Sequence, residues 1–118
     1  ICWGAMVTVV EAVSKAAIEK GVDVEIIDLR TLSPLDNEAI ISSVEKTGRV
    51  LVVHEAPKTC GLGAEIAAII SEKALLNLKA PVLRVTGQDV AVPLPKSEDY
   101  YIPSVARILK ALNYVMEF

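Results

Sequence analysis

A run of four consecutive aliphatic residues, Val50 to Val53, constrains the fold of this chain more than any other feature. A strand with one face in water alternates apolar and polar residues, whereas a strand buried on both faces is continuously apolar. Continuously apolar strands are typical of parallel sheets that carry helices on both sides. The run, with Arg49 before it, therefore predicts a central strand of an α/β fold.

The rest of the chain alternates between short β-branched runs and longer amphipathic stretches. We expect three further strands, at Ile1–Trp3, Val22–Leu29 and Val82–Thr86. In the longer stretches apolar residues recur at i, i+3, i+4 and i+7, which is the period of one helical face. The expected helices cover Met6–Lys20, Asn37–Thr47 and Leu62–Leu76, and a last helix follows the capping residue Ser104.

This order of elements, βαβαβαβ with a closing helix, predicts a three-layer α/β/α domain with a mainly parallel sheet. We expect the flavodoxin-like strand order 2-1-3-4. Gln88–Pro103 has no clear period and should be an irregular crossing segment. The length of 118 residues fits one domain, 1–118. Because the chain begins without a Met and inside an apolar run, we expect it to be a fragment of a longer protein.

Composition excludes several classes of function. The net charge is −3 without a basic cluster, and aromatic residues make up only 4% of the chain, which argues against a nucleic-acid partner. No apolar run is long enough to span a bilayer. Two cysteines, Cys2 and Cys60, are too few for a disulfide framework, so we expect a reducing compartment. That is the cytoplasm, or the mitochondrial matrix in a eukaryote.

His54 is the candidate catalytic residue by position. In an open parallel sheet, ligands meet the carboxyl ends of the strands where the strand order reverses, here at the loops that begin at Gly4 and at His54. His54 is the only histidine, and Glu55 adjoins it. Two interpretations remain open: the imidazole braces the loop by donating to a backbone carbonyl, or it points into a cleft that another domain completes. Asp28 and Arg30 should form a structural ion pair or capping contacts.

Three weaker candidates lie in the same loop. Gly61 and Gly63 could expose backbone N–H groups to an anion, or they could allow a tight strand-to-helix turn, which we favour because a full dinucleotide or P-loop motif is lacking. His54, Glu55 and Cys60 could ligate zinc, but they are too few for a closed site. Cys60 beside Lys58 could be an acidified thiol, but without a resolving cysteine nearby we interpret it as an ordinary loop cysteine.

The apolar C-terminal tail is the candidate partner-binding element. Tyr114, Met116 and Phe118 exceed what one helical face can bury, so the tail is either frayed or a docking element. From this pattern we expect that deleting residues 115–118 weakens partner binding and leaves the fold intact.

Four stretches together resemble a known family. Val24–Asp36 resembles a hallmark stretch of the transketolase C-terminal domain. His54–Thr59, followed by Gly61–Ile66, is similar to the β subunit of 2-oxo acid dehydrogenase complexes. Leu78–Asp89 and the ending Tyr101–Pro103 agree with it. The resemblance covers nearly the whole chain.

The resemblance implies a role within a larger enzyme. Such a β subunit joins an α subunit in an α2β2 decarboxylase that uses thiamine diphosphate and Mg²⁺ and passes an acyl group to lipoyl groups on a dihydrolipoyl acyltransferase. In the family, the α subunit holds the diphosphate and Mg²⁺, and an acidic residue of the β subunit's N-terminal domain activates the aminopyrimidine ring. The resemblance therefore implies no thiamine or metal ligand in this chain, which should be inactive in isolation.

What the resemblance leaves for this domain is oligomerisation and docking. Phe118 and its carboxylate match the family's apolar C-terminal position, near the surface that engages the acyltransferase's subunit-binding domain. Family domains carry an additional antiparallel edge strand, which is expected to be missing here. The His54–Pro57 stretch favours branched-chain over pyruvate members. Two alternatives stay open: the C-terminal domain of a transketolase or deoxyxylulose-phosphate synthase, and a free-standing flavodoxin-like binding module.

Overall fold

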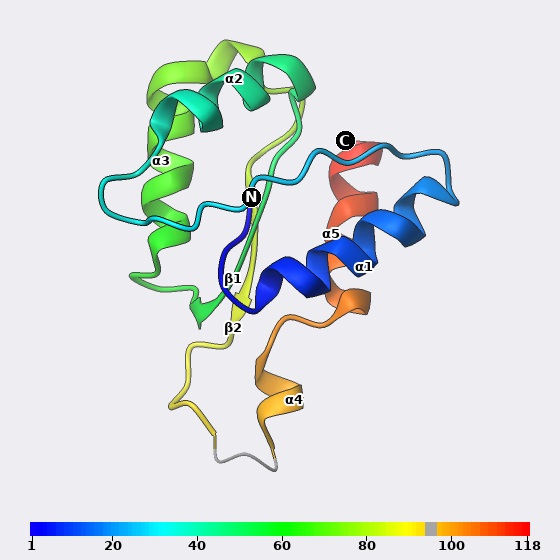
Figure 1. Ribbon diagram of the computed structural model, residues 1–118, viewed down its shortest axis with the longest axis vertical. Helices are drawn as coiled ribbons and strands as arrows, with labels where there is room; N and C mark the ends of the chain where they lie inside the picture. The colour runs from blue at the N-terminus through cyan, green and yellow to red at the C-terminus, as the bar shows by residue number, and fades with distance from the viewer. Residues whose placement is uncertain (94–96) are drawn as a thin grey trace.

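The sheet at the centre of the molecule is parallel and follows the predicted order. The computed structural model describes residues 1–93 and 97–118 (Figure 1). Strand β1 (Leu51–Pro57) pairs in parallel with β2 (Leu83–Gly87). On the other side of β1 lies the extended chain at Cys2, which forms isolated parallel bridges to Val53 and to Asp28. The order is therefore 2-1-3-4, as the sequence predicts.

The first two expected strands are much shorter than the sequence suggests. Cys2 N–H donates to the Ile27 carbonyl at 2.9 Å, and Leu29 N–H donates to the Cys2 carbonyl at 3.0 Å. Val53 N–H donates to the Ile1 carbonyl at 2.9 Å. The prediction of a regular strand over Val22–Leu29 is wrong, because within the described residues its first half has no strand beside it.

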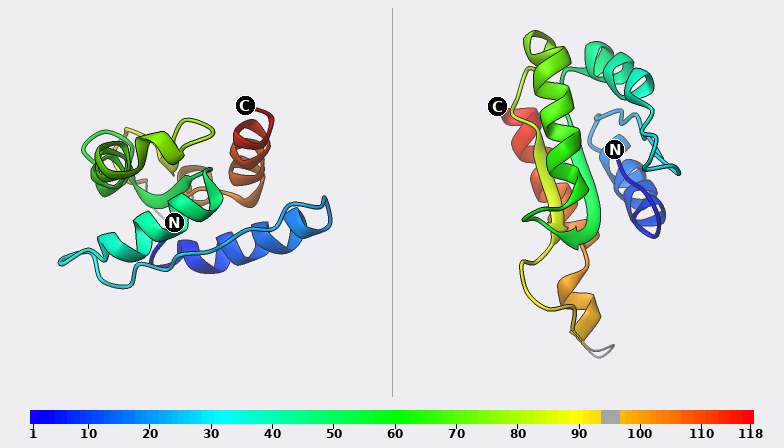
Figure 2. Two further views of the ribbon diagram at one scale, coloured as in Figure 1. Left: turned by 90° about the horizontal axis from the view of Figure 1, so that it is seen from above. Right: turned by 90° about the vertical axis from the view of Figure 1, so that its left-hand side faces the viewer.

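Helices cover both faces of the sheet, so the predicted three layers are confirmed. From above, α1 (Met6–Ile18) and α5 (Val105–Glu117) lie on one side, and α2 (Asn37–Thr47) and α3 (Leu62–Ala74) on the other (Figure 2). None of the helices described is long and apolar enough to cross a bilayer. The helix boundaries are close to those expected.

Two short helical elements refine the sequence prediction. The expected third helix gives way to a 3₁₀ turn, η1 (Leu75–Asn77). The segment that we expected to be irregular contains α4 (Glu98–Tyr101) and extends beyond the carboxyl end of β2 (Figure 1). Residues 94–96 of that segment lie outside the described part of the chain.

The alternation of side chains along β1 creates two cores. Val52 is fully buried against α2 and α3, and its neighbour Val53 is buried against α1 and α5. Burying each valine stabilises the fold by roughly 1.5–3 kcal/mol relative to exposure. The first core contains Leu29, Ile40, Val44, Val50, Val52, Ile66, Ile70 and Ala74. The second contains Cys2, Met6, Val10, Val13, Val53, Val85 and Ile108.

Polar caps and a left-handed glycine set the helix ends. The sequence offers Ser33 and Asp36 as caps for α2, and the structure selects Asp36, whose carboxylate accepts from Ala39 N–H at 3.0 Å. Gly48 ends that helix with a φ of 70°, a conformation that glycine adopts without a Cβ penalty. Ser104 caps α5 as predicted.

Candidate functional site

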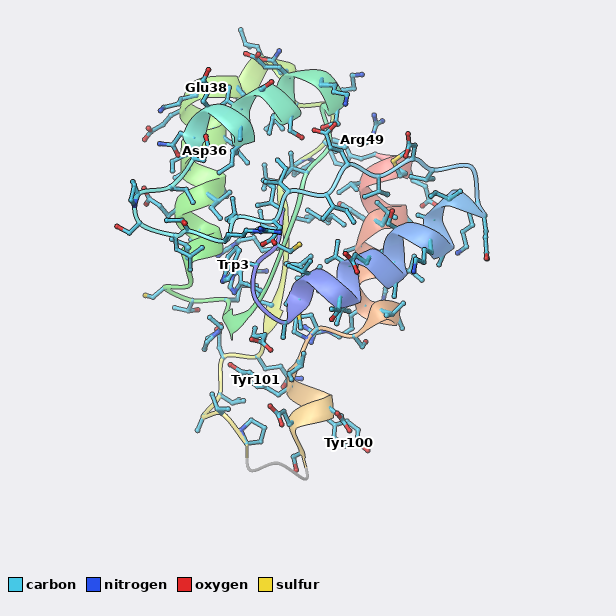
Figure 3. The ribbon with its side chains drawn as sticks, in the orientation of Figure 1. Trp3, Asp36, Glu38, Arg49, Tyr100 and Tyr101 are labelled. Atoms are coloured by element: carbon cyan, nitrogen blue, oxygen red, sulfur yellow. The ribbon has the colours of Figure 1, made fainter. Side chains whose placement is uncertain are left out.

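The carboxyl edge of the sheet places His54 beside Trp3. His54 lies in β1, where its side chain is 0% exposed. Trp3 follows the neighbouring extended segment, and its ring stacks on the imidazole with centroids 5.1 Å apart and planes inclined by 17°. Figure 3 labels Trp3 at this edge. This is the position between first and third strands where ligands meet such sheets, as the sequence analysis predicts.

The imidazole of His54 is buried without a polar partner. Among the described residues, neither Nδ1 nor Nε2 has a hydrogen-bond partner. Burial lowers the pKa of His54, and the charge of Arg84 acts in the same direction; the backbone of Ala56 opposes the shift although no hydrogen bond to it forms. The ring is therefore neutral at pH 7. The ring makes no regular hydrogen bond of the bracing kind considered from the sequence, and within this chain it does not face an open cleft.

Two glycines make room for the His54 ring. A Cβ atom on Gly63, in the first turn of α3, would lie 2.5 Å from His54 Nε2. A Cβ atom on Gly61 would lie 2.8 Å from His54 Cε1 and 2.3 Å from the Pro57 carbonyl oxygen. The tight turn that we expected explains the glycine at position 61 only in part, because the His54 ring also leaves no room for a Cβ atom there. Position 63 has to be glycine because α3 lies against the His54 imidazole, a contact that the sequence analysis missed.

The loop after β1 is tied to the end of β2. Thr59 donates to the Asp89 carboxylate twice, from its N–H at 2.8 Å and from its hydroxyl at 2.7 Å. These hydrogen bonds lower the pKa of Asp89. Arg84 Nη1 donates to the Lys58 carbonyl at 2.9 Å. The sequence analysis did not identify this pairing, because nothing in the sequence links Thr59 to an aspartate thirty positions away.

The structure does not bring the expected zinc ligands together. His54 is buried, whereas Cys60 is exposed and has a φ of 57°. Glu55 is exposed as well. In residues 1–93 and 97–118 no group of three or more His, Cys, Asp or Glu side chains is placed to hold a metal ion. The loop therefore offers no ligand set of the kind considered from the sequence.

Asp28 and Arg30 form the ion pair that the sequence predicts. Arg30 Nε lies 3.0 Å from the Asp28 carboxylate, and the Arg30 backbone N–H donates to the same carboxylate at 3.3 Å. The Arg30 side chain is largely exposed. Exposed pairs of this kind contribute little to stability, so we assign this one a local structural role.

The C-terminal tail is helical rather than frayed. Helix α5 continues to Glu117, and the buried Val115 belongs to it. Arg49 Nε donates to the Val115 carbonyl at 2.8 Å, and Figure 3 labels Arg49 beside the end of α5. Deleting residues 115–118 would remove this buried valine and this hydrogen bond. From these contacts we expect the deletion to lower the stability of the fold as well.

The three candidate partner-binding residues lie on two sides of α5. Tyr114 and Phe118 are 55% and 65% exposed, and their ring centroids lie 6.3 Å apart. We call these two residues the aromatic pair. Met116 is separated from Tyr114 by about 200° around the helix. Met116 lines a cavity between α1, α5 and the extended segment 22–27, which we call the amino-edge cavity.

Comparisons with known proteins place this arrangement in context. The family described as "Transketolase, C-terminal domain" matches residues 1–108. A pyruvate dehydrogenase E1 component subunit beta from Leifsonia xyli is 42% identical over 113 residues, which are 96% of this chain and 34% of the relative. A 2-oxoisovalerate dehydrogenase subunit beta from Pseudomonas aeruginosa is 48% identical over 118 residues, covering 99% of this chain and 32% of the relative.

One solved structure is similar over nearly the whole chain. It is described as "Split gene transketolase, inactive beta4 tetramer", with a TM-score of 0.84 and 23% identity over 98% of this chain and 37% of that one. At this identity the likeness concerns the fold alone. The chain spans about a third of the length of the curated relatives it matches.

Proposed function

The chain belongs to the transketolase C-terminal domain family, and from that membership we propose that it is the oligomerisation and docking domain of the β subunit of a 2-oxo acid dehydrogenase decarboxylase component. The β subunits of a pyruvate dehydrogenase and of a 2-oxoisovalerate dehydrogenase, at 42% and 48% identity, support a dehydrogenase β subunit over a transketolase. The transketolase structure is only 23% identical, and its likeness concerns the fold. The substrate class of the parent enzyme is a 2-oxo acid.

The aromatic pair is the observation that carries the docking role. Two large side chains lie exposed and in contact range on the last turn of a helix whose opposite side is packed in the core. Exposed aromatic residues are the usual anchors of protein interfaces, since they bury a large area at a small entropic cost. We propose that this end of α5 binds the acyltransferase's subunit-binding domain.

We assign thiamine diphosphate and Mg²⁺ to parts of the parent enzyme outside this domain. The glycine-containing turn before α3 is the one place where the sequence suggests an anion cradle, and the His54 ring occupies the space beside Gly61 and Gly63. The imidazole itself is neutral and enclosed. These residues do not fit a diphosphate or its metal ion, so we derive no catalytic step from this chain.

The further partners of the domain are, on this proposal, an α subunit and a second β subunit in an α2β2 assembly. Residues 88–93 and α4 support this, because they extend from the body of the molecule (Figures 1 and 3). Val90 and Val92 are exposed in the first of these stretches, and Tyr100 is exposed in α4. Exposed apolar side chains grouped on one projecting segment are typical of surfaces that a partner covers.

The test uses the α2β2 enzyme that contains this chain and a purified subunit-binding domain. Tyr114→Ala and Phe118→Ala are each compared with Leu76→Ala, which removes an exposed apolar side chain from η1. Calorimetric titration should show at least about tenfold weaker binding for the two α5 variants and no change for the control, because interface anchors contribute more than about 1.4 kcal/mol each. Gel filtration checks that each variant still assembles. Unchanged affinity for both α5 variants contradicts the docking role.

A further inference from the structure

The ring of His54 fills the space between the sheet and the start of α3. At the edge of the sheet opposite the amino-edge cavity, it stacks on Trp3 and lies against Gly61 and Gly63. The ring is fully buried, and among the described residues neither of its nitrogens has a hydrogen-bond partner. Buried polar groups without a partner are rare and costly, so packing alone does not account for a histidine at this position.

The surroundings of the ring disfavour a positive charge. A second N–H on the imidazole would find no acceptor among the described residues. No side chain caps α3 at Gly61, so the first turn of this helix presents unpaired N–H groups and the partial positive charge of a helix N-terminus. Burial lowers the pKa of His54, and the positive charge of Arg84 lowers it further. A proton on the ring is therefore repelled by the start of α3 and by Arg84.

The groups that favour a charged ring are weaker. The aromatic face of Trp3 attracts a cation, and the backbone of Ala56 acts in the same direction. Among the described residues no carboxylate forms an ion pair with the imidazole, and the exposed carboxylates act on it only through water. The charged groups on the elements around the ring are Glu55 of β1, Lys58 of the following loop, Glu65 of α3, Arg84 of β2, Asp89 after β2, and the pair Asp28 and Arg30. The net effect of these groups and of burial is a neutral ring.

The loop 58–61 can leave the sheet without unfolding the rest of the chain. Its first three residues are exposed. Among the described residues, side-chain hydrogen bonds tie it to β2 and to the segment after β2: two from Thr59 to Asp89 and one from Arg84 to the loop backbone, all of them at the surface. Surface hydrogen bonds with few buried apolar contacts mark the parts of a protein that open locally. Contact with the buried His54 ring is therefore central to keeping this loop closed.

We propose that His54 is an acid-sensitive latch: the neutral ring holds the loop 58–61 and the first turn of α3 against β1, and the protonated ring releases them. In the open form the ring reaches water and binds a proton with an ordinary pKa of about 6.5, whereas in the closed form it stays neutral. The open form therefore binds more protons below about pH 6.5, and its population rises as the pH falls. Opening uncovers the imidazole and the face of Trp3 on which it stacks.

Hydrogen exchange at about pH 7.5 and about pH 5.5 tests the latch in this chain. The reporters are the Thr59 amide, which donates to a carboxylate at 2.8 Å, and the Ala64 amide, which donates to the Gly61 carbonyl at 2.9 Å. After correction for intrinsic exchange rates, we expect opening at both amides to increase about five- to tenfold at the lower pH, the upper value applying when the closed ring stays fully neutral. The Leu83 amide, which belongs to the sheet, should exchange more slowly than both at either pH.

Two variants that do not titrate and one control assign the effect to the ring. His54→Gln and His54→Asn should abolish the pH dependence of opening at Thr59 and Ala64. Each chain is compared with itself at the two pH values, so a constant change in stability cancels in the ratio. Asp89→Asn weakens the tie to Thr59 and should raise opening at both pH values while keeping the five- to tenfold ratio. The ratio is kept because Asp89 stays ionised over this range in the parent chain, where the hydrogen bonds from Thr59 lower its pKa.

Three results of these experiments would overturn the proposal. The first is unchanged opening at Thr59 and Ala64 between the two pH values in the parent chain. The second is a pH ratio in His54→Gln or His54→Asn equal to that of the parent. The third is opening at both amides that depends on urea as steeply as opening at Leu83, which would mean that the whole sheet unfolds with the loop.

A further measurement needs no variant. His54 is the only histidine in the chain, so the NMR signal of its ring identifies itself. A ring that stays neutral in the closed form at about pH 5.5 supports the latch, and a closed form that titrates near the ordinary pKa of about 6.5 contradicts it. None of these measurements involves the aromatic pair, so their failure leaves the proposed docking function untouched.

Discussion

Replacing Gly63 with alanine tests the packing around His54 most sharply. The added Cβ would lie 2.5 Å from His54 Nε2, which is 0.9 Å short of the 3.4 Å at which ordinary contacts begin. The imidazole cannot tilt away, because Trp3 stacks on its face at 5.1 Å. Overpacking of this kind costs about 1–3 kcal/mol, and the better helix propensity of alanine returns at most about 1 kcal/mol. Because the 2.5 Å approach lies well inside any ordinary contact, we take the upper part of this range, about 2–3 kcal/mol, and expect Gly63→Ala to lose about 1–2 kcal/mol of unfolding free energy.

Urea denaturation of four chains measures this effect: the parent, Gly63→Ala, His54→Ala and the double variant. If the Cβ–imidazole clash is the cause, Gly63→Ala costs less in the His54→Ala background, and the double-mutant cycle gives a favourable coupling of about 1 kcal/mol or more. Ala64→Gly, at an exposed position in the same turn, measures the propensity contribution alone. A Gly63→Ala chain that is as stable as the parent refutes the reasoning.

Three further predictions concern titration, backbone strain and the loop after β1. The pKa of His54 is lower in the folded chain than in the unfolded chain, so the unfolded chain binds more protons below about pH 6.5. The contribution of His54 to stability is therefore full above that pH and is lost as the pH falls towards the lowered pKa. In His54→Phe the urea midpoint should depend less on pH between pH 5 and 7 than it does in the parent chain. Cys60→Gly should raise the free energy of unfolding by about 1 kcal/mol in thermal denaturation, because a left-handed φ of 57° strains any residue with a Cβ; a loss of stability would show that the conformation is unstrained. Asp89→Asn should speed hydrogen exchange at the Thr59 amide several-fold, since a neutral amide oxygen is a weaker acceptor than the carboxylate; an unchanged rate would show that this bond does not hold the loop.

The sequence was informative wherever the signal is local or periodic. The continuous run Val50 to Val53 predicts a strand buried on both faces, and Val52 and Val53 indeed contribute to opposite cores. The helical faces follow from the same period. The topological rule for parallel sheets then places His54 at the carboxyl edge beside the first strand, where its ring stacks on Trp3.

The contacts that the sequence could not predict join residues far apart in the chain. Apolar spacing over Val22–Leu29 indicates which side chains are buried, but it does not reveal whether a neighbouring strand is long enough to pair with them. The hydrogen bond from Arg49 to the Val115 carbonyl spans 66 positions, and it turns an apolar tail into part of the fold. Gly63 is a similar case. A side chain is excluded there because the ring of His54, nine residues earlier in the chain, lies directly against α3.

The central claim is that this domain docks and assembles while the reacting groups lie elsewhere in the parent enzyme. The most direct measurement compares two rates for the α2β2 enzyme that carries both Tyr114→Ala and Phe118→Ala: decarboxylation of a 2-oxo acid with an artificial electron acceptor, and acyl transfer to lipoyl groups in the assembled complex. We predict an unchanged first rate and a second rate reduced at least tenfold. A reduced first rate in a correctly assembled enzyme would contradict the account.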